Sequence, residues 1–423
     1  MLLESEYGYL YEEVENINYL LSLNMELPAE YIEDVSRTIS TFNKLSENND
    51  FTDKISLNNM KEGEYRYLID EQGNSLIDIY NKKIKEVTLD VEYINSLYNK
   101  MILKRNEYIQ QQLYKDYFTY YKEKNDNNLL DKLFNSKVNQ VIPNYIKELK
   151  LFYNKYEIND NDILHPFKLN NIRINNQKYK VNFKEDVLEN IKIMDSDFGK
   201  YLERIYNEGF IIIRESNLQE GFFIELPYTK KGFVYLGCIG DIDDYFNTIH
   251  EIGHLYHQYI TSNVEYKNQC NSLEIKEFVA HSFEALFVRQ FTSEKVKQIY
   301  EIQQISSVLW NVVLFEFQKI IYRNFDDYVC LEEKEHIFVN LIKKYTHSYL
   351  DNTNKYDILL GSTWMYESML FETPFYNCEY IYAQINAVDI LNDHQGSLEE
   401  LKNNFKNGKN INIKSLEQVI KHE

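Results

Sequence analysis

The sequence predicts a mainly α-helical protein with one small β-sheet. Its 423 residues include only 5 Pro and 13 Gly, so long stretches contain no helix-breaking residue. Hydrophobic residues make up 44% of the chain and charged residues 26%, the composition of a globular protein with a buried core. Two short apolar runs between positions 210 and 239 are typical of strands. This length suits one large domain or two closely packed ones.

The first part of the chain is expected to be helical. Apolar residues recur at steps of three and four within Tyr65–Tyr80 and Val87–Tyr121, the spacing of an amphipathic helix. The helical pattern then gives way to an Asn-rich segment around Pro166, which is expected to be a connector. We therefore predict a helical region at 1–165 and a second region at 166–423, with the alternative that both form one continuous body.

Phe210–Arg214 and Gly232–Ile239 are the predicted strands, and helices are expected from Asp243 to the end. The second strand is apolar on both of its faces, which predicts a position between two layers. It ends a few residues before a histidine-rich motif. We expect it to be an edge strand beside that motif, with free backbone groups and with close access at Gly237.

Charge and cysteine usage exclude several kinds of partner. The net charge is −20, from 46 basic and 66 acidic side chains, so the surface should repel nucleic acid and anionic membranes. The four cysteines form no CxxC pair, as expected for reduced thiols in the cytoplasm. No apolar run is long enough to span a membrane, and the first residues lack the pattern of a signal peptide.

Residues 250–257 read H-E-I-G-H-L-Y-H and contain the candidate metal-binding and catalytic residues. His250 and His254 are four residues apart, so on a helix both imidazoles can bind one zinc ion. The carboxylate of Glu251 is then placed to act as general base toward a water. Candidate N-terminal caps for this helix precede it at Asp241, Asp243 and Asp244.

A carboxylate on the next predicted helix, Asn271–Val288, should complete the metal site. Glu277, His281 and Glu284 share one face of that helix, and we favour Glu277 as ligand, with Glu274 next. Glu284 and His281 are expected behind the ligands, where a carboxylate can orient a ligating histidine. His257 should be a buried polar partner of neighbouring carboxylates. Gly253 predicts that another element packs closely on the motif helix.

These residues resemble the thimet oligopeptidase and oligoendopeptidase F family, whose signature is HExGHxxH. In that family the third ligand is a Glu on the next helix, followed by another Glu seven residues later, as at Glu277 and Glu284. The segment T-P-F-Y-N-C-E-Y-I-Y-A-Q, which begins at Thr373, is similar to the family's tyrosine-rich segment. Tyr376 and Tyr380 match its tyrosines.

The resemblance covers roughly Asp195 to Leu391. It implies an elongated helical zincin-type fold with a deep central channel, a single zinc ion, short peptide substrates and tyrosine hydroxyls that stabilise the oxyanion. The chain departs from the family at two positions. Met369 stands where a His is usual, and Asn377 stands where a second adjacent Tyr is common.

The predicted function is zinc-dependent hydrolysis of peptide bonds in short peptides, by an oligopeptidase or endopeptidase. The substrate backbone is expected to pair with the strand at Phe233, Tyr235 and Gly237. Two alternatives remain open: a peptide-binding protein that retains the metal but turns over weakly, and a carboxypeptidase of related fold.

Overall fold

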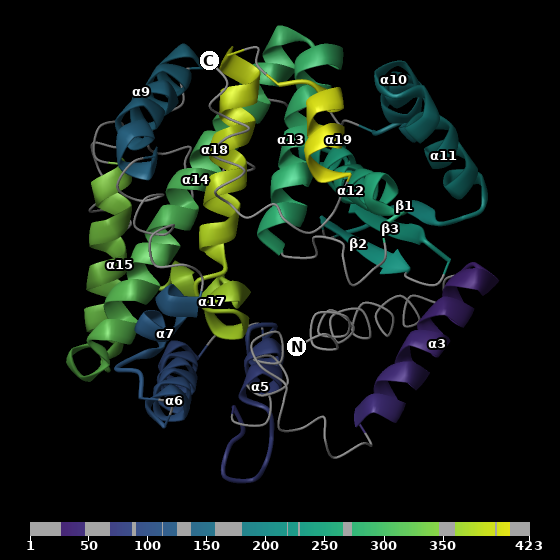
Figure 1. Ribbon diagram of the computed structural model, residues 1–423. Coiled ribbons are helices and arrows are strands. Elements are labelled where there is room, and N and C mark those ends of the chain that lie inside the picture. Colours follow the sequence, from purple (N-terminus) through teal and green to yellow (C-terminus); the bar gives the residue numbers. More distant parts are fainter. Residues whose placement is uncertain are drawn as a thin grey trace. The chain divides into compact units, whose positions relative to one another are not determined.

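The computed structural model describes residues 27–46, 68–86, 90–111, 113–124, 137–156, 180–217, 219–226, 229–264, 273–346, 360–393 and 396–406 (Figure 1). The chain divides into two compact units, and each contains more than one stretch of sequence. The first unit consists of Met1–Asn59, Asn175–Glu301 and Asn386–Glu423, and the second of Met60–Ile174 and Ile302–Ile385. This division differs from the predicted boundary at 166, because residues distant in sequence pack together within each unit.

The first unit contains the whole sheet and the motif helix. Its elements are α3 (Ala29–Ser46), η6 (Phe183–Leu188), α10 (Glu189–Met194), α11 (Ser196–Asn207), β1 (Ile211–Glu215), β2 (Glu220–Leu226), β3 (Lys231–Cys238), α12 (Ile242–Thr261), α13 (Leu273–Phe291) and α19 (Leu398–Phe405).

In the described part of the second unit the regular elements are helices, apart from an isolated β-bridge between Ile69 and Ser75. The elements of this unit are α5 (Leu76–Lys83), α6 (Val91–Gln110), α7 (Tyr117–Lys124), α9 (Asn139–Lys155), η8 (Phe325–Asp327), α15 (Leu331–Thr346), η10 (Thr363–Tyr366) and α17 (Ser368–Glu372). The helices α14 (Glu294–Arg323) and α18 (Asn377–Asp393) each contribute residues to both units.

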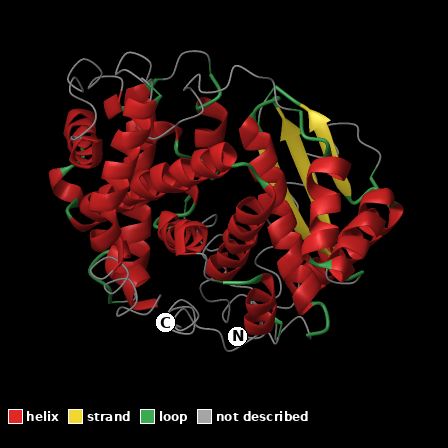
Figure 2. Cartoon of the chain, turned by 90° about the horizontal axis from the view of Figure 1, so that it is seen from above, coloured by secondary structure: helices red, strands yellow, loops and turns green. Residues whose placement is uncertain are grey.

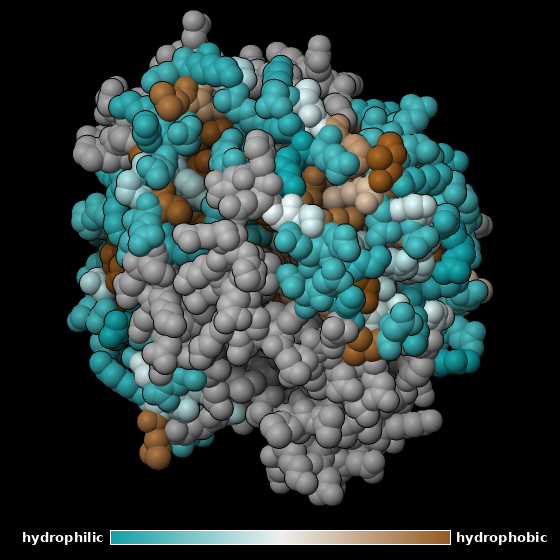
Figure 3. All heavy atoms as spheres, turned by 45° about the horizontal axis from the view of Figure 1, so that its top comes forward, coloured by the Kyte–Doolittle hydropathy of each residue, from teal (hydrophilic) through white to brown (hydrophobic). Residues whose placement is uncertain are grey.

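The fold class predicted from the sequence is confirmed. In Figure 2 the strands lie together in one group, and the other regular elements drawn are helices. Fully buried aromatic residues such as Trp364, Tyr98 and Phe198 fill the interior, which accounts for part of the high tyrosine and phenylalanine content. On the face shown in Figure 3, hydrophilic side chains predominate and hydrophobic ones form separate patches. No helix in the described ranges is long and apolar enough to cross a membrane.

The sheet has the order β1-β3-β2, with β1 parallel and β2 antiparallel to β3. The prediction that β3 is an edge strand is therefore wrong, because both of its sides are paired. Gly237, for example, lies between Arg214 of β1 and Glu220 of β2. Strand β2 was missed in the sequence, where it begins with Glu-Gly and shows only a short apolar run.

β3 does lie between two layers, as its two apolar faces predicted. Helix α12 packs on one face, where a Cβ on Gly232 would come within 2.5 Å of Leu255. On the other face Phe233 contacts Tyr31 of α3, with ring centroids 4.6 Å apart. Tyr235 stacks on Phe222 of β2 at 5.1 Å. Phe233 and Tyr235 are thus fully buried core residues, and their contact with a substrate stays a prediction.

Candidate metal centre and active site

The motif helix α12 begins immediately after β3 and is fixed at its start by a capping box. The side chain of Asp241 accepts hydrogen bonds from the amides of Asp243 and Asp244, and Asp244 returns a bond to the backbone of Asp241. A carboxylate at a helix N-terminus satisfies amides that have no partner within the helix. The predicted capping is confirmed. It fixes where α12 begins after β3, and therefore where His250 and His254 lie relative to the sheet.

Helices α12 and α13 approach each other closely at Gly253. A Cβ there would lie 2.8 Å from the Cα of Ala280 and 2.9 Å from its carbonyl oxygen. Backbone atoms cannot move aside as a flexible side chain can, so only glycine fits at this position. The close packing predicted from Gly253 is confirmed. It brings the His250–His254 face of α12 onto the Glu277–Glu284 face of α13.

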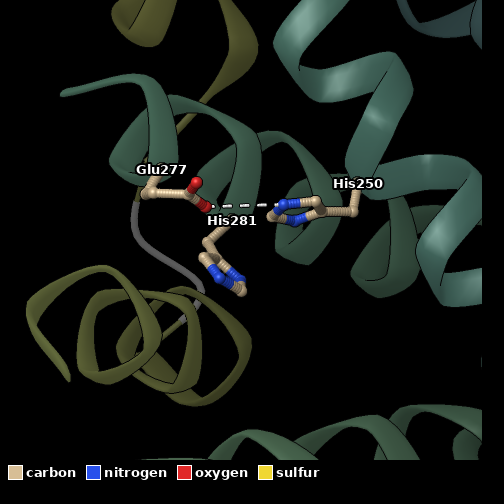
Figure 4. A group of neighbouring side chains, drawn as sticks. All are labelled: His250, Glu277 and His281. Carbon is tan, nitrogen blue, oxygen red and sulfur yellow. Dashed lines mark ion pairs between the residues drawn. The ribbon is translucent and has the colours of Figure 1, made fainter. Parts of the chain in front are cut away.

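Three of the predicted donors come together where the helices meet. Nε2 of His250 lies 3.2 Å from Nε2 of His254, and it lies 3.5 Å from Oε2 of Glu277. Nε2 of His254 lies 3.8 Å from Oε1 of Glu277. Figure 4 shows the Glu277 carboxylate pointing across from its helix to the His250 ring. The side chain of Glu274 lies outside the described side chains.

His281 forms part of the same cluster. It has a nitrogen within 4.8 Å of donor atoms of His250 and Glu277, and its ring centroid lies 4.7 Å from that of His250. The three-atom group that includes His254 is tighter, since its separations do not exceed 3.8 Å. We therefore regard His281 as a neighbour of the donor group rather than a member of it.

Glu284 lies on the opposite side of the His250 ring. Its Oε2 is 3.4 Å from Nδ1 of His250 and also 3.4 Å from Nδ1 of His281. A carboxylate at Nδ1 holds an imidazole with its Nε2 directed the other way. The carboxylate also faces Tyr300, whose pKa is raised by burial and by the charge of Glu284.

The electrostatics of the cluster are those of buried, closely coupled groups. Burial alone would lower the pKa of His250, but the adjacent carboxylates of Glu277 and Glu284 outweigh burial and raise it well above the ordinary value. Burial lowers the pKa of His254 to about 3. Burial raises the pKa of Glu277, but the nearby histidines outweigh it and bring the value to about 2. Burial also raises the pKa of Glu284, but His250 and His281 outweigh it and lower the value. Glu277 and Glu284 therefore both carry negative charge in a largely buried site.

Glu251 lies on the sheet side of α12. Its side chain is buried against β2, since a Cβ on Gly221 would lie 3.2 Å from Oε1 of Glu251. Burial raises its pKa to about 7, and the carboxylates of Glu277 and Glu284 add to the rise while His250 opposes it. A carboxylate with a pKa near neutrality can accept and release a proton at physiological pH.

His257 is buried one turn beyond His254, as predicted. No carboxylate in the described ranges forms an ion pair with it, and its Nε2 has no hydrogen-bond partner there. Burial lowers its pKa to about 3, and the charge of Lys276 contributes to that decrease. Its ring instead faces Phe405 of α19 at 6.4 Å. Its predicted pairing with neighbouring carboxylates is not found among these residues.

Tyr376 and Tyr380 belong to the second unit. They lie at the start of α18, with their hydroxyl oxygens 3.2 Å apart. The two departures from the family pattern also lie in this unit and contact each other. Nδ2 of Asn377 is 3.9 Å from Sδ of Met369, and it donates a hydrogen bond to Oδ1 of Asn311. Asn377 is thus buried, and its side chain forms a hydrogen bond between α18 and α14.

Sequence reasoning missed two features near the donors. The first is Gly221, whose position in β2 brings the strand against Glu251. The second is an ion pair between Lys276 of α13 and the buried Glu225 of β2, at 3.6 Å. Gly221 stands at the start of a short apolar run, and this was a usable signal for the first. The ion pair depends on strand pairing and could not be read from spacing.

The helical fold that contains this donor cluster is similar to that of solved peptidase structures. The chain resembles PZ peptidase A, in a structure with an inhibitor, with a TM-score of 0.62 and 17% identity over 86% of this chain and 71% of that one. It also resembles a protein from Bacillus anthracis assigned as an oligoendopeptidase F, with a TM-score of 0.53 and 16% identity over 99% of this chain and 75% of that one.

A second structure assigned as an oligoendopeptidase F matches with a TM-score of 0.56 and 14% identity over 86% of this chain and 71% of that one. No protein-family model matches the sequence, and no curated protein matches it. The fold of this chain is that of the oligoendopeptidase F and PZ peptidase structures. The resemblance drawn from the motif is therefore confirmed at the level of the fold.

Proposed function

We propose that this protein hydrolyses peptide bonds in short peptides with one zinc ion bound by His250, His254 and Glu277. The observation that carries the proposal is the spacing of the three donors, from 3.2 to 3.8 Å. Ligands about 2.0–2.1 Å from a tetrahedral zinc ion lie roughly 3.3 Å from one another. Glu251 is buried next to this group and has a pKa of about 7.

The chemistry of the donor set fits the metal. Two imidazoles and one carboxylate, with room for a further ligand, are the donor set of a catalytic rather than a structural zinc site. Oε2 of Glu277 is buried and has no hydrogen bond within the described residues. A buried carboxylate oxygen without a hydrogen bond is unfavourable unless a cation lies beside it. The charges of Glu277 and Glu284 together would balance a divalent ion.

A zinc ion in this site supplies Lewis acidity, which lowers the pKa of a water and polarises a carbonyl group. The protein supplies the proton transfer. We assign Glu251 as the general base that accepts the proton of the attacking water and passes it to the leaving amine. Burial serves this role, because it keeps the pKa of the carboxylate close to the working pH. Glu284 holds the ring of His250 through Nδ1.

Tyr376 and Tyr380 are proposed to stabilise the oxyanion. A phenol donates a hydrogen bond to a developing negative charge without bringing a charge of its own. The pairing of the two hydroxyls at 3.2 Å supports a joint role, because one hydroxyl can orient the other. This assignment rests on the resemblance of the Thr373 segment to the family.

The substrate backbone is proposed to pair with β2 rather than with β3. β2 is an outer strand of the described sheet, and Gly221 places it against Glu251. Phe223, two residues further along, lies with its ring 6.1 Å from that of His254. Main-chain pairing with an edge strand recognises extended backbone rather than particular side chains. We therefore expect broad sequence tolerance among short peptides.

The experiment that tests the function is hydrolysis of a quenched fluorescent peptide library with and without a metal chelator. Internal cleavage that is lost with chelator and restored by zinc supports the proposal. Binding without cleavage would favour the peptide-binding alternative, and stepwise release of C-terminal residues would favour a carboxypeptidase. Cleavage that is unaffected by full metal removal would rule the proposal out.

Metal analysis tests the ligand set directly. Purified protein should hold about one equivalent of zinc, and Glu277→Ala should hold far less. Glu203→Ala is the matched control, because Glu203 forms only a partly exposed pair with Lys192. If Glu277→Ala keeps a full equivalent, Glu277 is not the ligand and Glu274 becomes the next candidate.

A further inference from the structure

The segment before the tyrosine pair contains a residue in an unusual backbone conformation. Phe375 has a φ of 69°, in the left-handed region, and it lies between the end of α17 and the start of α18. For a residue with a side chain this conformation costs roughly 1–2 kcal/mol. It persists only where the surroundings impose it, and such positions occur often at functional sites.

One side chain imposes it from the neighbouring helix. Gln318 of α14 is fully buried, and its Oε1 accepts a hydrogen bond of 2.8 Å from the amide of Phe375. Its Nε2 donates to the carbonyl of Leu370 at 3.3 Å. The amide of Gln318 thus spans the turn between α17 and α18, with an acceptor at one side and a donor at the other. An amide side chain offers both a donor and an acceptor without a charge.

The remaining groups of Phe375 are held as well. Its carbonyl accepts hydrogen bonds from the hydroxyl of Tyr121 at 3.3 Å and from the amide of Cys378 at 3.0 Å. Its ring is fully buried among other aromatic rings, including Phe118 at 5.1 Å and Tyr322 at 5.3 Å. The ring contacts hold the side chain, and Gln318 holds the amide. Together they determine the direction in which the chain continues to Tyr376.

We propose that Gln318 is a positioning residue that, by holding Phe375 in the left-handed conformation, keeps the Tyr376 hydroxyl beside that of Tyr380. The effect on catalysis rests on the proposed function, whereas the effect on backbone and tyrosine position does not. Gln318 acts through Phe375 and Tyr376, and we assign it no contact with substrate.

The placement is tested without reference to activity. In the wild-type protein the Phe375 amide should be protected from hydrogen exchange. In Gln318→Met, which keeps the size of the side chain but removes the amide, exchange at Phe375 should be at least about tenfold faster. Gln318→Glu retains an acceptor for this amide and should restore much of the protection. Gln304→Leu, a buried glutamine on the same helix, is the matched control and should leave exchange at Phe375 unchanged.

The catalytic consequence is tested by a double-mutant cycle. Gln318→Met should lower kcat by about ten- to a hundredfold with little change in KM, because a misplaced donor weakens only the transition state. In the Tyr376→Phe background the same substitution should change kcat by less than about twofold, since the hydroxyl it positions is already absent. A general loss of structure would instead lower activity in both backgrounds.

The two proposals can fail separately. If the wild-type protein cleaves no peptide, the proposed function fails, and exchange at Phe375 still decides the role of Gln318. If Phe375 is unprotected in the wild type, or if a crystal structure of Gln318→Met keeps the hydroxyls 3.2 Å apart as here, the positioning role is overturned. Equal losses of kcat from Gln318→Met in both backgrounds would overturn it as well.

Discussion

Oε2 of Glu284 lies 3.4 Å from Nδ1 of His250, on the side of the ring away from Glu277. Helix α13 therefore holds this imidazole of α12 at both of its nitrogens. One carboxylate faces the donor group and the other orients the ring. This arrangement leads to separate expectations for residues that bind the metal, residues that orient its ligands and residues that transfer protons.

Replacement of Glu284 should weaken zinc binding without removing a ligand. We expect Glu284→Gln to lower zinc affinity by about ten- to a hundredfold, the usual effect of losing a carboxylate behind a ligating histidine. Competition with a chromophoric chelator measures this directly. Glu203→Gln serves as control. An unchanged affinity would mean that His250 is oriented by the packing alone.

Replacement of Glu251 should abolish turnover and leave the metal in place. Glu251→Gln is nearly isosteric but cannot accept a proton, so kcat should fall by several orders of magnitude. General base catalysis typically contributes a factor of about 10²–10⁴ to the rate. The zinc content and the thermal unfolding midpoint should stay near those of the wild type. Near-normal turnover in this variant would place the base elsewhere or show that the reaction is not hydrolysis.

Gly253→Ala should separate the two helices that carry the donors. Alanine is the better helix former by about 1 kcal/mol, but its Cβ would meet backbone of Ala280 at 2.8 Å. Overpacking of this kind costs about 1–3 kcal/mol, so the net effect should be destabilising. Zinc affinity should fall in the same variant because α13 must move.

The control for this variant is Gly361→Ala in the second unit, where a new Cβ would meet side-chain atoms of Glu335 at 3.0 Å. We expect it to leave zinc affinity unchanged. Calorimetric unfolding and zinc titration provide the two measurements. A Gly253→Ala protein with wild-type zinc affinity would show that the donor group tolerates the shift.

Removal of a tyrosine hydroxyl should reduce kcat more than it changes KM. Tyr376→Phe and Tyr380→Phe should each lower kcat by about 10²–10³-fold, as when one donor to an oxyanion is lost. Tyr382→Phe is the control, since it lies on the same helix and its ring faces Lys137 at 5.4 Å. Steady-state kinetics on one peptide suffice. A loss confined to KM would assign the pair to substrate binding instead.

Lys334 should make the stability of the protein depend on pH in the alkaline range. It is fully buried, and Nζ donates to Asn95 at 2.9 Å and to the carbonyl of Val329 at 3.0 Å. Burial lowers its pKa from 10.5 to about 8. The unfolded chain therefore binds this proton more tightly than the folded one, and the contribution of Lys334 to stability rises as the pH increases from about 8 to 10.5.

The rise should amount to roughly 3–4 kcal/mol at most, because one unit of pKa difference equals about 1.4 kcal/mol. Urea unfolding at pH 7 and pH 10 compares the wild type with Lys334→Met, which should lack this component. Lys344→Met on the same helix is the control, because Lys344 forms an exposed pair with Glu316. The same pH dependence in the wild type and in Lys334→Met would contradict the expectation.

The sequence by itself determined the helical class, the motif helix with an acidic cap among Asp241, Asp243 and Asp244, and the close packing at Gly253. These depend on local rules: helical periodicity, the capping preference of carboxylates and the need for glycine where two backbones meet. The candidate donors were also read from spacing, because residues four apart on a helix share a face whatever surrounds it.

Tertiary structure alone decided the position of β3, the pairing of β2 with it and the division of the chain into two interleaved units. A strand that is apolar on both faces is read as buried, but its sequence does not say whether one or both of its edges are paired. Backbone hydrogen bonds determine that, and they are independent of the side-chain pattern. The hydrogen bond from the amide of Phe375 to Gln318 likewise joins residues far apart in sequence. Only tertiary packing could therefore bring Gln318 to the segment that leads to Tyr376.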